Sequence, residues 1–355
     1  MITVIIPTVR RPRLLVRAIR SVQAQTATDL TIAVTDNASG DSTREVVASM
    51  MALDSRIRYH EQPNNLGPHA NFQHALEQVD TPYFTLLSDD DIMLPHFLAD
   101  SLSELEREPE AMFAACPVLL VDPQGQLLKL HGDRWSPGMH RPPQGLLEMT
   151  RQGHFIWTGS VFRTAVRGAV RLDRQTGNSS DMDFQLRVAA RYAFITRLRP
   201  GAIFYWHPQS PSSHPDLAQF WPAWGKIMAN LNAIETLPQG VRSQAIANLD
   251  ARLHRSLVLV GLYAASQRRW DDAAGVARLL TERYRDVAAA ALISATAWPA
   301  RRLPIMPAML ASVAWHLRWV GRHRLGPYQR ELNTRYQSLL TVPTEAELRR
   351  KDSAA

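Results

Sequence analysis

Residues 82–91 read Pro82-Tyr83-Phe84-Thr85-Leu86-Leu87-Ser88-Asp89-Asp90-Asp91, an apolar run that ends in three adjacent carboxylates. The run predicts a buried strand. The carboxylates repel one another unless water or a cation neutralises them, and in open α/β sheets ligands bind where the strands end. Mg²⁺ and Mn²⁺ prefer oxygen ligands of this kind, so the triplet indicates a metal and nucleotide site. For an isolated triplet, a solvated acidic loop is the alternative.

Strand and helix patterns alternate through the N-terminal part of the chain. They predict strands at 3–6, 30–35, 57–60 and 83–87, and helices at 14–25 and 71–79. A further helix should begin at Ser42, which forms a capping box with Glu45. The strands show little internal alternation, which is typical of a parallel sheet covered on both faces. The predicted class is therefore α/β, with a mostly parallel sheet between two layers of helices.

Beyond residue 110 the patterns are first mixed and then helical. We expect strands at 113–121 and 202–206, a hairpin turn at 123–125, a loop near the site at 137–143 and a helix at 181–191. Further helices are expected at 217–236, 240–267, 271–297 and 307–323. The chain should thus divide into an α/β domain at 1–212 and a helical region at 213–355, which would contact an acceptor, a second copy or a membrane.

The composition is that of a globular protein, with 45% hydrophobic and 21% charged residues among 355. Cys116 is the single cysteine, which excludes an internal disulfide and favours a reducing compartment. Residues 1–7 lack the basic start of a signal peptide, and no apolar stretch reaches the roughly 18–20 residues that span a bilayer. We therefore expect a cytoplasmic protein. Its net charge of +7 suits an anionic partner.

The segment 298–330 contains arginines and tryptophans but no acidic residue. Basic and aromatic residues on short helices suit the surface of an anionic membrane. A packed helix with a solvated basic face, or a contact in a homo-oligomer, are the alternatives. The segment carries no recognisable nucleic-acid-binding motif, so we expect no nucleic-acid partner.

Four sequence pieces occur in a characteristic order: Ile2 to Pro7, Thr35 to Asp41, Asn64-Asn65-Leu66-Gly67 and Ser88 to Asp91. Together they resemble the family 2 glycosyltransferases, and the resemblance covers about residues 1–210. It implies a GT-A fold, a nucleotide-sugar donor and an inverting reaction. The processive synthases of that family carry a Gln-x-x-Arg-Trp element, which is absent here, so the resemblance favours transfer of a single sugar.

The resemblance also implies a set of nucleotide-binding residues. The turn at Pro7 and Thr8, with Arg10, would lie against the base and ribose. Asp36 would accept a hydrogen bond from the pyrimidine N3–H, and Asn65 would lie in a loop near the donor. The residues alone also allow Asp36 to be a turn residue.

Two neighbouring positions have a structural interpretation. Asp41 suits the cap of the next helix, and Gly67 suits a backbone with positive φ.

The acidic triplet matches the DxD motif of the family. The resemblance makes Asp91 the direct ligand of Mn²⁺ or Mg²⁺ and places Asp89 on the ribose or on a metal-bound water. Asp90 is counted with the nucleotide-binding residues, although of the three it is the one expected to be merely exposed. His207 would complete the metal site, with His214 as the competing ligand.

Two later stretches complete the predicted site. Trp157-Thr158-Gly159-Ser160 resembles a loop that lines the donor sugar and the entrance for the acceptor, where Gly159 would let the backbone approach the sugar; an ordinary turn before a strand is the alternative. Asp181 corresponds to the family's general base at a helix N-terminus, although Ser180 replaces the usual Glu. Asp183 is the competing base, and both carboxylates could merely favour the helix dipole.

The sequence thus predicts an inverting, metal-dependent glycosyltransferase that uses a UDP-sugar, or next a dTDP-sugar. The acceptor would be a surface glycan, for example one linked to a lipid, and the protein would lie peripherally on the inner face of the membrane. A sugar-1-phosphate nucleotidyltransferase is an alternative, but it would carry a Gly-rich loop where residues 7–13 have none. A catalytically silent module that binds a sugar nucleotide or a glycan is the alternative outside enzymology.

Overall fold

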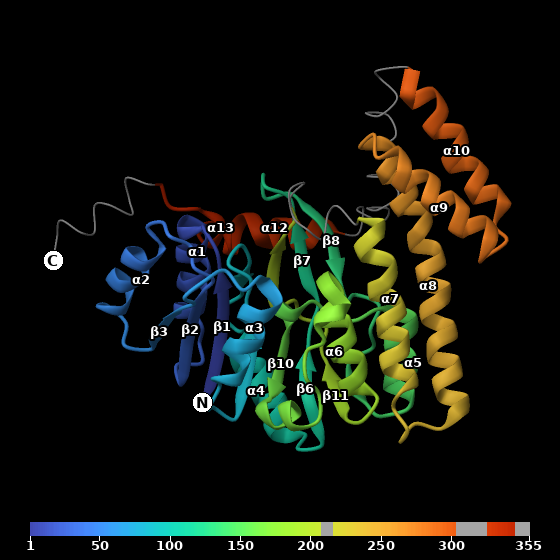
Figure 1. The fold of residues 1–355 in the computed structure, drawn as a ribbon. Helices are drawn as coiled ribbons and strands as arrows, with labels where there is room; N and C mark the ends of the chain where they lie inside the picture. The colour runs from blue at the N-terminus through green and yellow to red at the C-terminus, as the bar shows by residue number, and fades with distance from the viewer. Residues whose placement is uncertain (207–215, 303–324, 345–355) are drawn as a thin grey trace.

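The computed structural model describes residues 1–206, 216–302 and 325–344. It has an α/β domain flanked by a group of long helices, as Figure 1 shows. Two short helices close to the C-terminal end of the described chain cross back over the α/β domain.

The main sheet has eight strands in the order β3-β2-β1-β4-β10-β6-β11-β9. The strands β1 to β4 run parallel to one another, as do β6 and β11, whereas β10 and β9 are antiparallel to their neighbours. The predicted α/β class is confirmed, with a mixed sheet. Its strands are β1 (Ile2–Thr8), β2 (Leu30–Asp36), β3 (Ile57–Glu61), β4 (Tyr83–Leu86), β6 (Ala111–Ala115), β9 (Gly138–His140), β10 (Ser160–Arg163) and β11 (Ala193–Thr196).

Helices cover both faces of this sheet, as predicted. Val4 and Ile6 of β1 belong to one core with α1 and α4, whereas Ile5 belongs to another with α3 and α6, because successive side chains of a strand point to opposite faces. The helices of this domain are α1 (Pro12–Gln23), α2 (Thr43–Met51), α3 (Pro68–Glu77), α4 (Phe97–Arg107), α5 (Gln144–Gln152) and α6 (Ser180–Ala189).

Strand β1 runs through Pro7, although the sequence predicts that it stops there. Ile5 accepts a hydrogen bond from the N–H of Leu87 on the β4 side. The backbone nitrogen of Pro7, two residues further on, faces that same side, where β4 has already ended at Leu86. An N–H at this position would therefore have no partner in β4. The proline therefore costs no hydrogen bond in the sheet.

A second sheet of four strands has the order β5-β12-β7-β8, with β5 (Ile92–Met93), β7 (Val118–Val121), β8 (Leu127–His131) and β12 (Ala202–Tyr205). The predicted single strand at 113–121 is wrong. Pro117 separates β6 from β7, which belong to different sheets, because a proline has no N–H with which to continue the ladder. The predicted hairpin turn joins β7 to β8 and contains Gly125 with a φ of 77°.

Two smaller expectations in this domain are also wrong. The loop predicted near the site at 137–143 contains β9, which lies at the far edge of the main sheet from β3. The predicted capping box at Ser42 does not form. Instead the carboxylate of Asp41 accepts from the backbone N–H of Thr43 at 3.0 Å, so Asp41 caps the helix as expected.

The long helices are α7 (Leu217–Asn232), α8 (Gln239–Ser266), α9 (Trp270–Glu282) and α10 (Val287–Arg302). The predicted continuous helix at 271–297 is wrong, because Arg285 has a φ of 54° and Asp286 accepts from the N–H of Ala289 to begin a new helix. The helix predicted at 307–323 lies outside the described residues. Among the described residues, none of the helices combines the length and apolar character needed to cross a bilayer.

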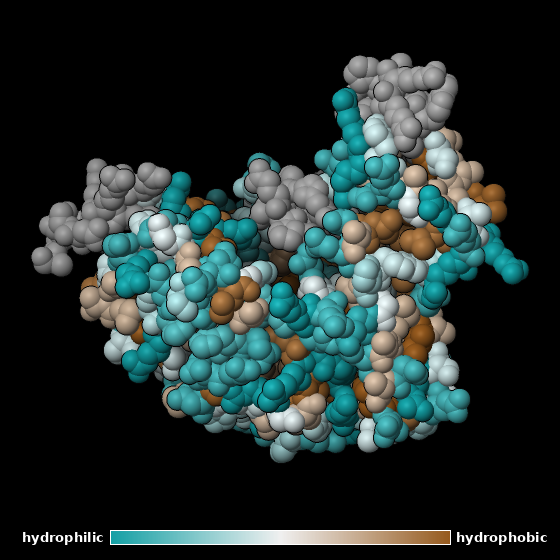
Figure 2. All heavy atoms as spheres, in the orientation of Figure 1, coloured by the Kyte–Doolittle hydropathy of each residue, from teal (hydrophilic) through white to brown (hydrophobic). Residues whose placement is uncertain are grey.

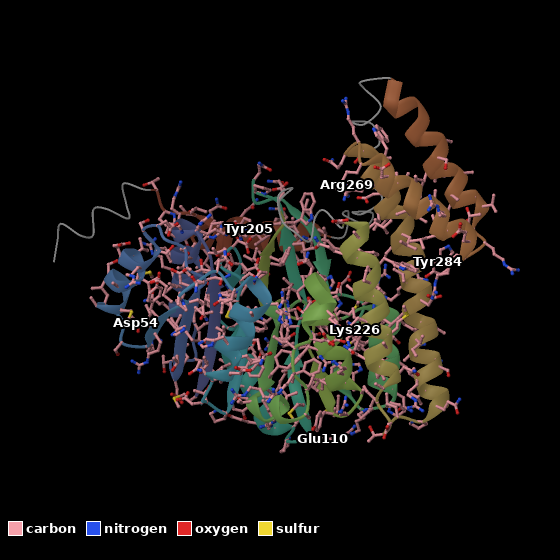
Figure 3. All side chains as sticks on the ribbon, viewed as in Figure 1. Asp54, Glu110, Tyr205, Lys226, Arg269 and Tyr284 are labelled. Carbon is pink, nitrogen blue, oxygen red and sulfur yellow. The ribbon has the colours of Figure 1, made fainter. Side chains whose placement is uncertain are left out.

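Helix α7 is held to the α/β domain by polar contacts as well as by a shared core. Lys226 (Figure 3) pairs with Asp173 at 3.3 Å, and Asn230 donates to Asp183 at 2.9 Å. Figure 2 shows apolar patches over α8 to α10 among mostly hydrophilic surface. Leu259, Val287 and Leu292 are exposed hydrophobic side chains of these helices.

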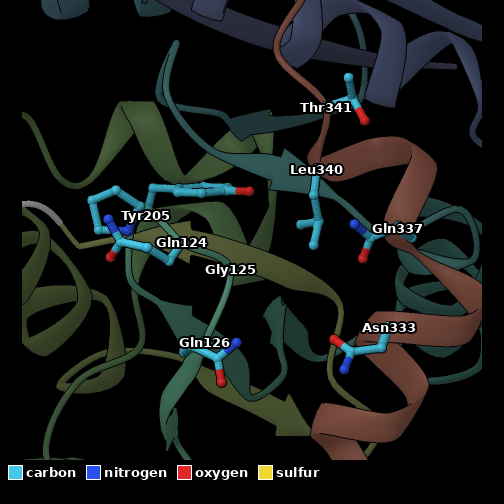
Figure 4. Close-up of a pocket in the computed structure, with 9 residues that line it drawn as sticks. Gln124, Gly125, Gln126, Tyr205, Asn333, Gln337, Leu340 and Thr341 are labelled. Carbon is cyan, nitrogen blue, oxygen red and sulfur yellow. The ribbon is translucent and has the colours of Figure 1, made fainter.

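The helices α12 (Gly326–Arg335) and α13 (Gln337–Leu340) pack on the second sheet, where Leu332 and Tyr336 join a core with Ile203 and Tyr205. A pocket of about 510 Å³ lies between these helices and the β7–β8 turn (Figure 4). The division of the chain at 212 stays a prediction, but residues 325–344 lie against the α/β domain and not with the long helices.

Candidate active site

The ends of β1, β2 and β4 bring the predicted nucleotide-binding residues to one edge of the sheet. Thr8 lies beside Asp36 in the parallel register of β1 and β2. The hydroxyl of Thr8 donates to Asp89 Oδ2 at 2.7 Å, which ties β1 to the loop after β4. This is the arrangement expected from strands that end at a common edge.

Asp36 is buried and fixed in orientation. Its Oδ1 accepts from the backbone N–H and hydroxyl of Ser39, and its Oδ2 accepts from the hydroxyl of Tyr59 at 2.7 Å. Burial, followed by the hydrogen bond to Asp36, raises the pKa of Tyr59, so this phenol stays a donor. The predicted contact of Asp36 with a pyrimidine base stays a prediction.

Three loops at this edge are joined by side-chain hydrogen bonds. The backbone N–H of Arg10 donates to Ser39 Oγ at 2.8 Å, which links the loops after β1 and β2. Asn37 donates to Asn65 Oδ1 at 2.9 Å and accepts from the N–H of Leu66 at 2.8 Å. Gly67 has a φ of 80°, as predicted. The loops therefore form one connected wall that contains Arg10 and Asn65.

Arg11 compensates two carboxylates of the triplet. Its guanidinium donates to Asp89 Oδ1 at 3.1 Å and to Asp90 Oδ2 at 2.9 Å. Burial, and then the charge of Asp90, raises the pKa of Asp89 to about 6, although Arg11 acts in the opposite direction. The expectation that Asp90 is merely exposed is wrong, because its side chain is only 15% exposed and pairs with Arg11.

Asp91 is fully buried, and its partners are interior groups. The hydroxyl of Thr158 donates to Oδ2 at 2.7 Å, and the backbone N–H of Tyr205 donates to Oδ1 at 3.1 Å. Burial, and then the charge of Asp90, raises the pKa of Asp91 well above its usual range. Asp91 thus joins the acidic loop to the start of β10 and the end of β12.

Sequence reasoning missed Arg17, which is 4% exposed behind the triplet. Its guanidinium donates to the carbonyl of Asp90 at 2.6 Å and lies 4.0 Å from the ring centroid of Tyr205. It also donates to the carbonyl of Leu340 at 3.4 Å. An arginine in an amphipathic helix normally indicates a solvated face, so the pattern of α1 gave no signal for this role.

The donor atoms of the triplet fit a hard divalent cation, because they are carboxylate oxygens gathered at a nucleotide-binding edge. Within residues 1–206, 216–302 and 325–344, no group of three or more His, Cys, Asp or Glu side chains is arranged to hold a metal. The predicted ligand His207 and its competitor His214 lie outside the described residues. Residue 207 follows β12, whose Tyr205 contacts Asp91.

The predicted sugar-lining loop at 157–160 is mostly a packed part of the interior. Trp157 is partly buried against Phe72 and Phe184, while Thr158, Gly159 and Ser160 are buried. A Cβ on Gly159 would lie 2.5 Å from a methyl group of Val118 and 2.9 Å from the carbonyl oxygen of Cys116. Close packing within the protein therefore accounts for Gly159 without any approach of the backbone to a sugar. The role of the loop in lining the sugar stays a prediction.

Substituting Gly159 with Ala should lower the stability of the protein by about 1–3 kcal/mol, the usual cost of overpacking a filled core. Chemical unfolding of the purified variant measures this cost, and Gly168→Ala is the matched control because its added Cβ would meet no atom within 4 Å. A Gly159→Ala variant that keeps full stability while losing donor affinity would support the sugar contact instead.

Asp181 and Asp183 have different environments in the first turn of α6. Asp181 is 19% exposed; its Oδ2 lies 3.1 Å from His154 Nε2 and its Oδ1 accepts from the N–H of Met182. Asp183 is buried, pairs with Arg187 at 2.8 Å and accepts from Asn230 at 2.9 Å. Asp183 is thus committed to holding α6 and α7, whereas Asp181 reaches the surface.

Sequence reasoning also missed His154. It follows Gly153, whose φ of 114° ends α5, and nothing in the pattern links it to a carboxylate 27 residues later. Residues 154 to 160 therefore contact Asp181 at one end, through His154, and Asp91 near the other, through Thr158. This short segment therefore contacts both the candidate base and the acidic triplet.

Comparison with known proteins identifies a family model that matches the N-terminal part of the chain. The model of "Glycosyl transferase family 2" matches residues 3–166. The chain is 35% identical over 129 residues to the GalNAc(5)-diNAcBac-PP-undecaprenol beta-1,3-glucosyltransferase of Campylobacter jejuni, a match that covers 36% of this chain and 41% of that relative. It is 23% identical over 197 residues to an uncharacterized glycosyltransferase, MJ1057, of Methanocaldococcus jannaschii, which covers 55% of this chain and 67% of the relative.

Solved structures share the fold at low sequence identity. TarS of S. aureus, residues 1–349, in complex with UDP-GlcNAc has a TM-score of 0.63 and 15% identity, covering 83% of this chain and 90% of that one. The mannosyltransferase PcManGT of Pyrobaculum calidifontis in complex with GDP-Man and Mn²⁺ has a TM-score of 0.51 and 16% identity, covering 90% and 87%. Residues 3–166 therefore match the family 2 glycosyltransferase model, and the α/β domain that contains them has the GT-A fold.

Proposed function

We propose that this protein transfers one sugar from a nucleotide-sugar donor to a hydroxyl group of a glycan acceptor. The observation that carries the proposal is the segment 154–160, which contacts both the acidic triplet and the candidate base. The UDP-GlcNAc bound by TarS favours a UDP-sugar, with a dTDP-sugar next, and the name of the Campylobacter jejuni relative favours a lipid-linked acceptor.

The wall of loops at the sheet edge would hold the nucleoside. Pro7 and Thr8 end β1 and Arg10 follows it, Asp36 ends β2, and Asn65 lies in the loop after β3. Because hydrogen bonds already fix Asp36, its carboxylate would need no rearrangement to meet a pyrimidine N3–H. An acceptor at N3–H does not separate uracil from thymine.

Mn²⁺ or Mg²⁺ would hold the donor diphosphate and offset the charge that develops on it. The sequence assigns the direct contact to Asp91. Asp91 is fully buried and both of its oxygens accept from interior donors, and Asp89 is likewise buried, with Thr8 and Arg11 on its two oxygens. We therefore assign Asp90, the least buried of the three, to the ion, and Asp89 and Asp91 to holding the loop. His207 stays a proposed further ligand.

Asp181 would act as the general base. It would remove the proton from an acceptor hydroxyl whose oxygen attacks C1 of the sugar, while the bond between C1 and the diphosphate breaks on the opposite face. This geometry inverts the configuration at C1. General-base catalysis and the alignment of donor with acceptor would together supply the acceleration.

A thermal-shift screen tests the nucleotide site, because a ligand that binds only the folded state raises the melting temperature. Against UDP, dTDP, GDP and CDP, with and without Mn²⁺, we expect the largest shift with UDP and Mn²⁺. Asp90→Asn should remove the part of the shift that depends on Mn²⁺ and change the melting temperature of the free protein only slightly, because the amide oxygen can still accept from Arg11.

The matched control is Asp80→Asn, which changes an exposed carboxylate before the opposite end of β4. Asp91→Asn tests whether Asp91 holds the loop or binds the ion. If Asp91 holds the loop, this substitution lowers the melting temperature even without nucleotide; if it binds the ion, only the Mn²⁺-dependent shift is lost. Absence of a shift with all four nucleotides, in folded protein, would contradict the site. A shift without any turnover would favour the silent binding module.

We also propose a peripheral position on the inner face of the membrane, through the basic segment 298–330. Most of this segment lies outside the described residues, and the support is its composition and the lipid-linked acceptor named for the relative. Deleting residues 298–355 would also remove α12 and α13, which pack beside the site. Substitution of the arginines therefore tests membrane binding more cleanly than deletion. A contact in a homo-oligomer is the alternative role that we propose for this basic segment.

A further inference from the structure

We propose that His154 is a positioning residue that fixes the carboxylate of Asp181 in the orientation needed to accept the proton of the acceptor. The inference rests on the proposed function, in which Asp181 is the base. His154 Nε2 lies 3.1 Å from Asp181 Oδ2, and both side chains are about one-fifth exposed. Oδ1 accepts from the N–H of Met182 at 2.7 Å. Both oxygens are therefore tethered.

The surroundings of the ring indicate which nitrogen carries the proton. His154 Nδ1 is buried and has no hydrogen-bond partner among the described residues. Asp181 Oδ2 can only accept, so the contact requires a proton on Nε2, and a second proton on Nδ1 would leave a buried N–H unsatisfied. The neutral ring with its proton on Nε2 is thus favoured, and this N–H donates to Asp181.

A second histidine fixes the backbone of His154. The Nε2 of His131 donates to the carbonyl of His154 at 2.9 Å. Burial lowers the pKa of His131 to about 4, so His131 is neutral near pH 7. Gln185 of α6 also clamps the next residue, because its amide donates to the carbonyl of Phe155 at 2.7 Å and accepts from the Phe155 N–H at 2.9 Å.

These contacts leave room for the acceptor on Asp181. An ionised carboxylate offers about four acceptor positions, and the described residues occupy two of them, through His154 and Met182. The remaining positions can accept from a sugar hydroxyl. Because the segment that holds His154 also binds Asp91 through Thr158, the tether sets Asp181 relative to the donor side of the site.

The test compares His154→Ala with His154→Gln, since the amide nitrogen of glutamine can donate from nearly the position of Nε2. His154→Ala should lower kcat by about 100-fold, the effect of a small misplacement of a reacting group, while the KM for the donor stays within about twofold. His154→Gln should recover most of kcat. Gln152→Ala, an exposed change at the end of α5, is the matched control and should behave as wild type.

Crystal structures of the same variants provide a readout that does not need turnover. The Asp181 carboxylate should leave its position in His154→Ala and keep it in His154→Gln. A His154→Ala variant with wild-type kcat, a Gln variant no better than Ala, or an unmoved Asp181 would overturn the proposal. Absence of transfer by the wild-type protein would instead contradict the proposed function, and the structures would still decide whether His154 positions Asp181.

Discussion

Asp181→Asn should retain donor affinity and reduce sugar transfer by about 10²- to 10⁴-fold, the usual contribution of a general base. The amide has nearly the shape of the carboxylate, and its oxygen can still accept the hydrogen bond from His154. It cannot take a proton from the acceptor, however. Release of the nucleoside diphosphate, followed under steady state with a UDP-sugar and a glycan acceptor, measures the transfer, and calorimetric titration of UDP with Mn²⁺ measures donor binding.

The control for this experiment is the melting temperature of the variant. It should fall only slightly, because Asp181 is partly exposed and the amide oxygen keeps the contact with His154, while the N–H of Met182 loses its side-chain acceptor. A variant with unchanged kcat would remove Asp181 from the proton transfer. A variant that loses donor affinity as well would show that Asp181 acts on binding and not on the chemical step.

Asp183→Ala should destabilise the protein by about 3–5 kcal/mol, the cost of removing one partner of a buried ion pair. Arg187 is 15% exposed and would be left without its carboxylate, and Asn230 of α7 would lose an acceptor. Urea-induced unfolding, with the midpoint and slope compared between variants, measures the loss. The long helices should unfold at the same midpoint as the α/β domain, since α6 and α7 meet at this residue.

The matched comparison is Asp181→Ala, two residues away on the same helix, which should cost much less stability. The opposite pattern would reverse the assignment of the two carboxylates: a stable Asp183→Ala with a large loss of kcat would make Asp183 the base. The pair of variants therefore separates a role in folding from a role in chemistry within one helical turn.

The N-terminal half of the fold could be predicted because its signals are local. Apolar runs without alternation, each followed by turn residues, locate β1 to β4 and therefore the strand ends at Thr8 and Asp36 and the loop that holds Asp89. The incorrectly predicted strand and helix also have local causes. Pro117 divides an apolar run that otherwise reads as one strand, and the positive φ of Arg285 breaks a continuous helical pattern.

The supporting residues of the site could not be predicted, since their roles depend on segments far apart in the sequence. Arg17 is polar on a helix that reads as amphipathic, yet it lies buried behind Asp90. Asp181 and Asp183 differ only through their contacts with His154 and with Asn230 of α7. The sequence therefore left the choice between them open.

The packing of residues 325–344 against the N-terminal part has a consequence for synthesis on the ribosome. Arg13 donates to the carbonyl of Pro343 at 2.7 Å, a contact between residues 330 positions apart. At typical translation rates these two residues emerge about 15–65 s apart. Throughout that interval Arg17 lacks its contact with Leu340, and the second sheet lacks the cover of α12 and α13. In a nascent chain, the contacts of Arg13 and Arg17 with residues 340–343 should thus form only after residue 344 has left the exit tunnel.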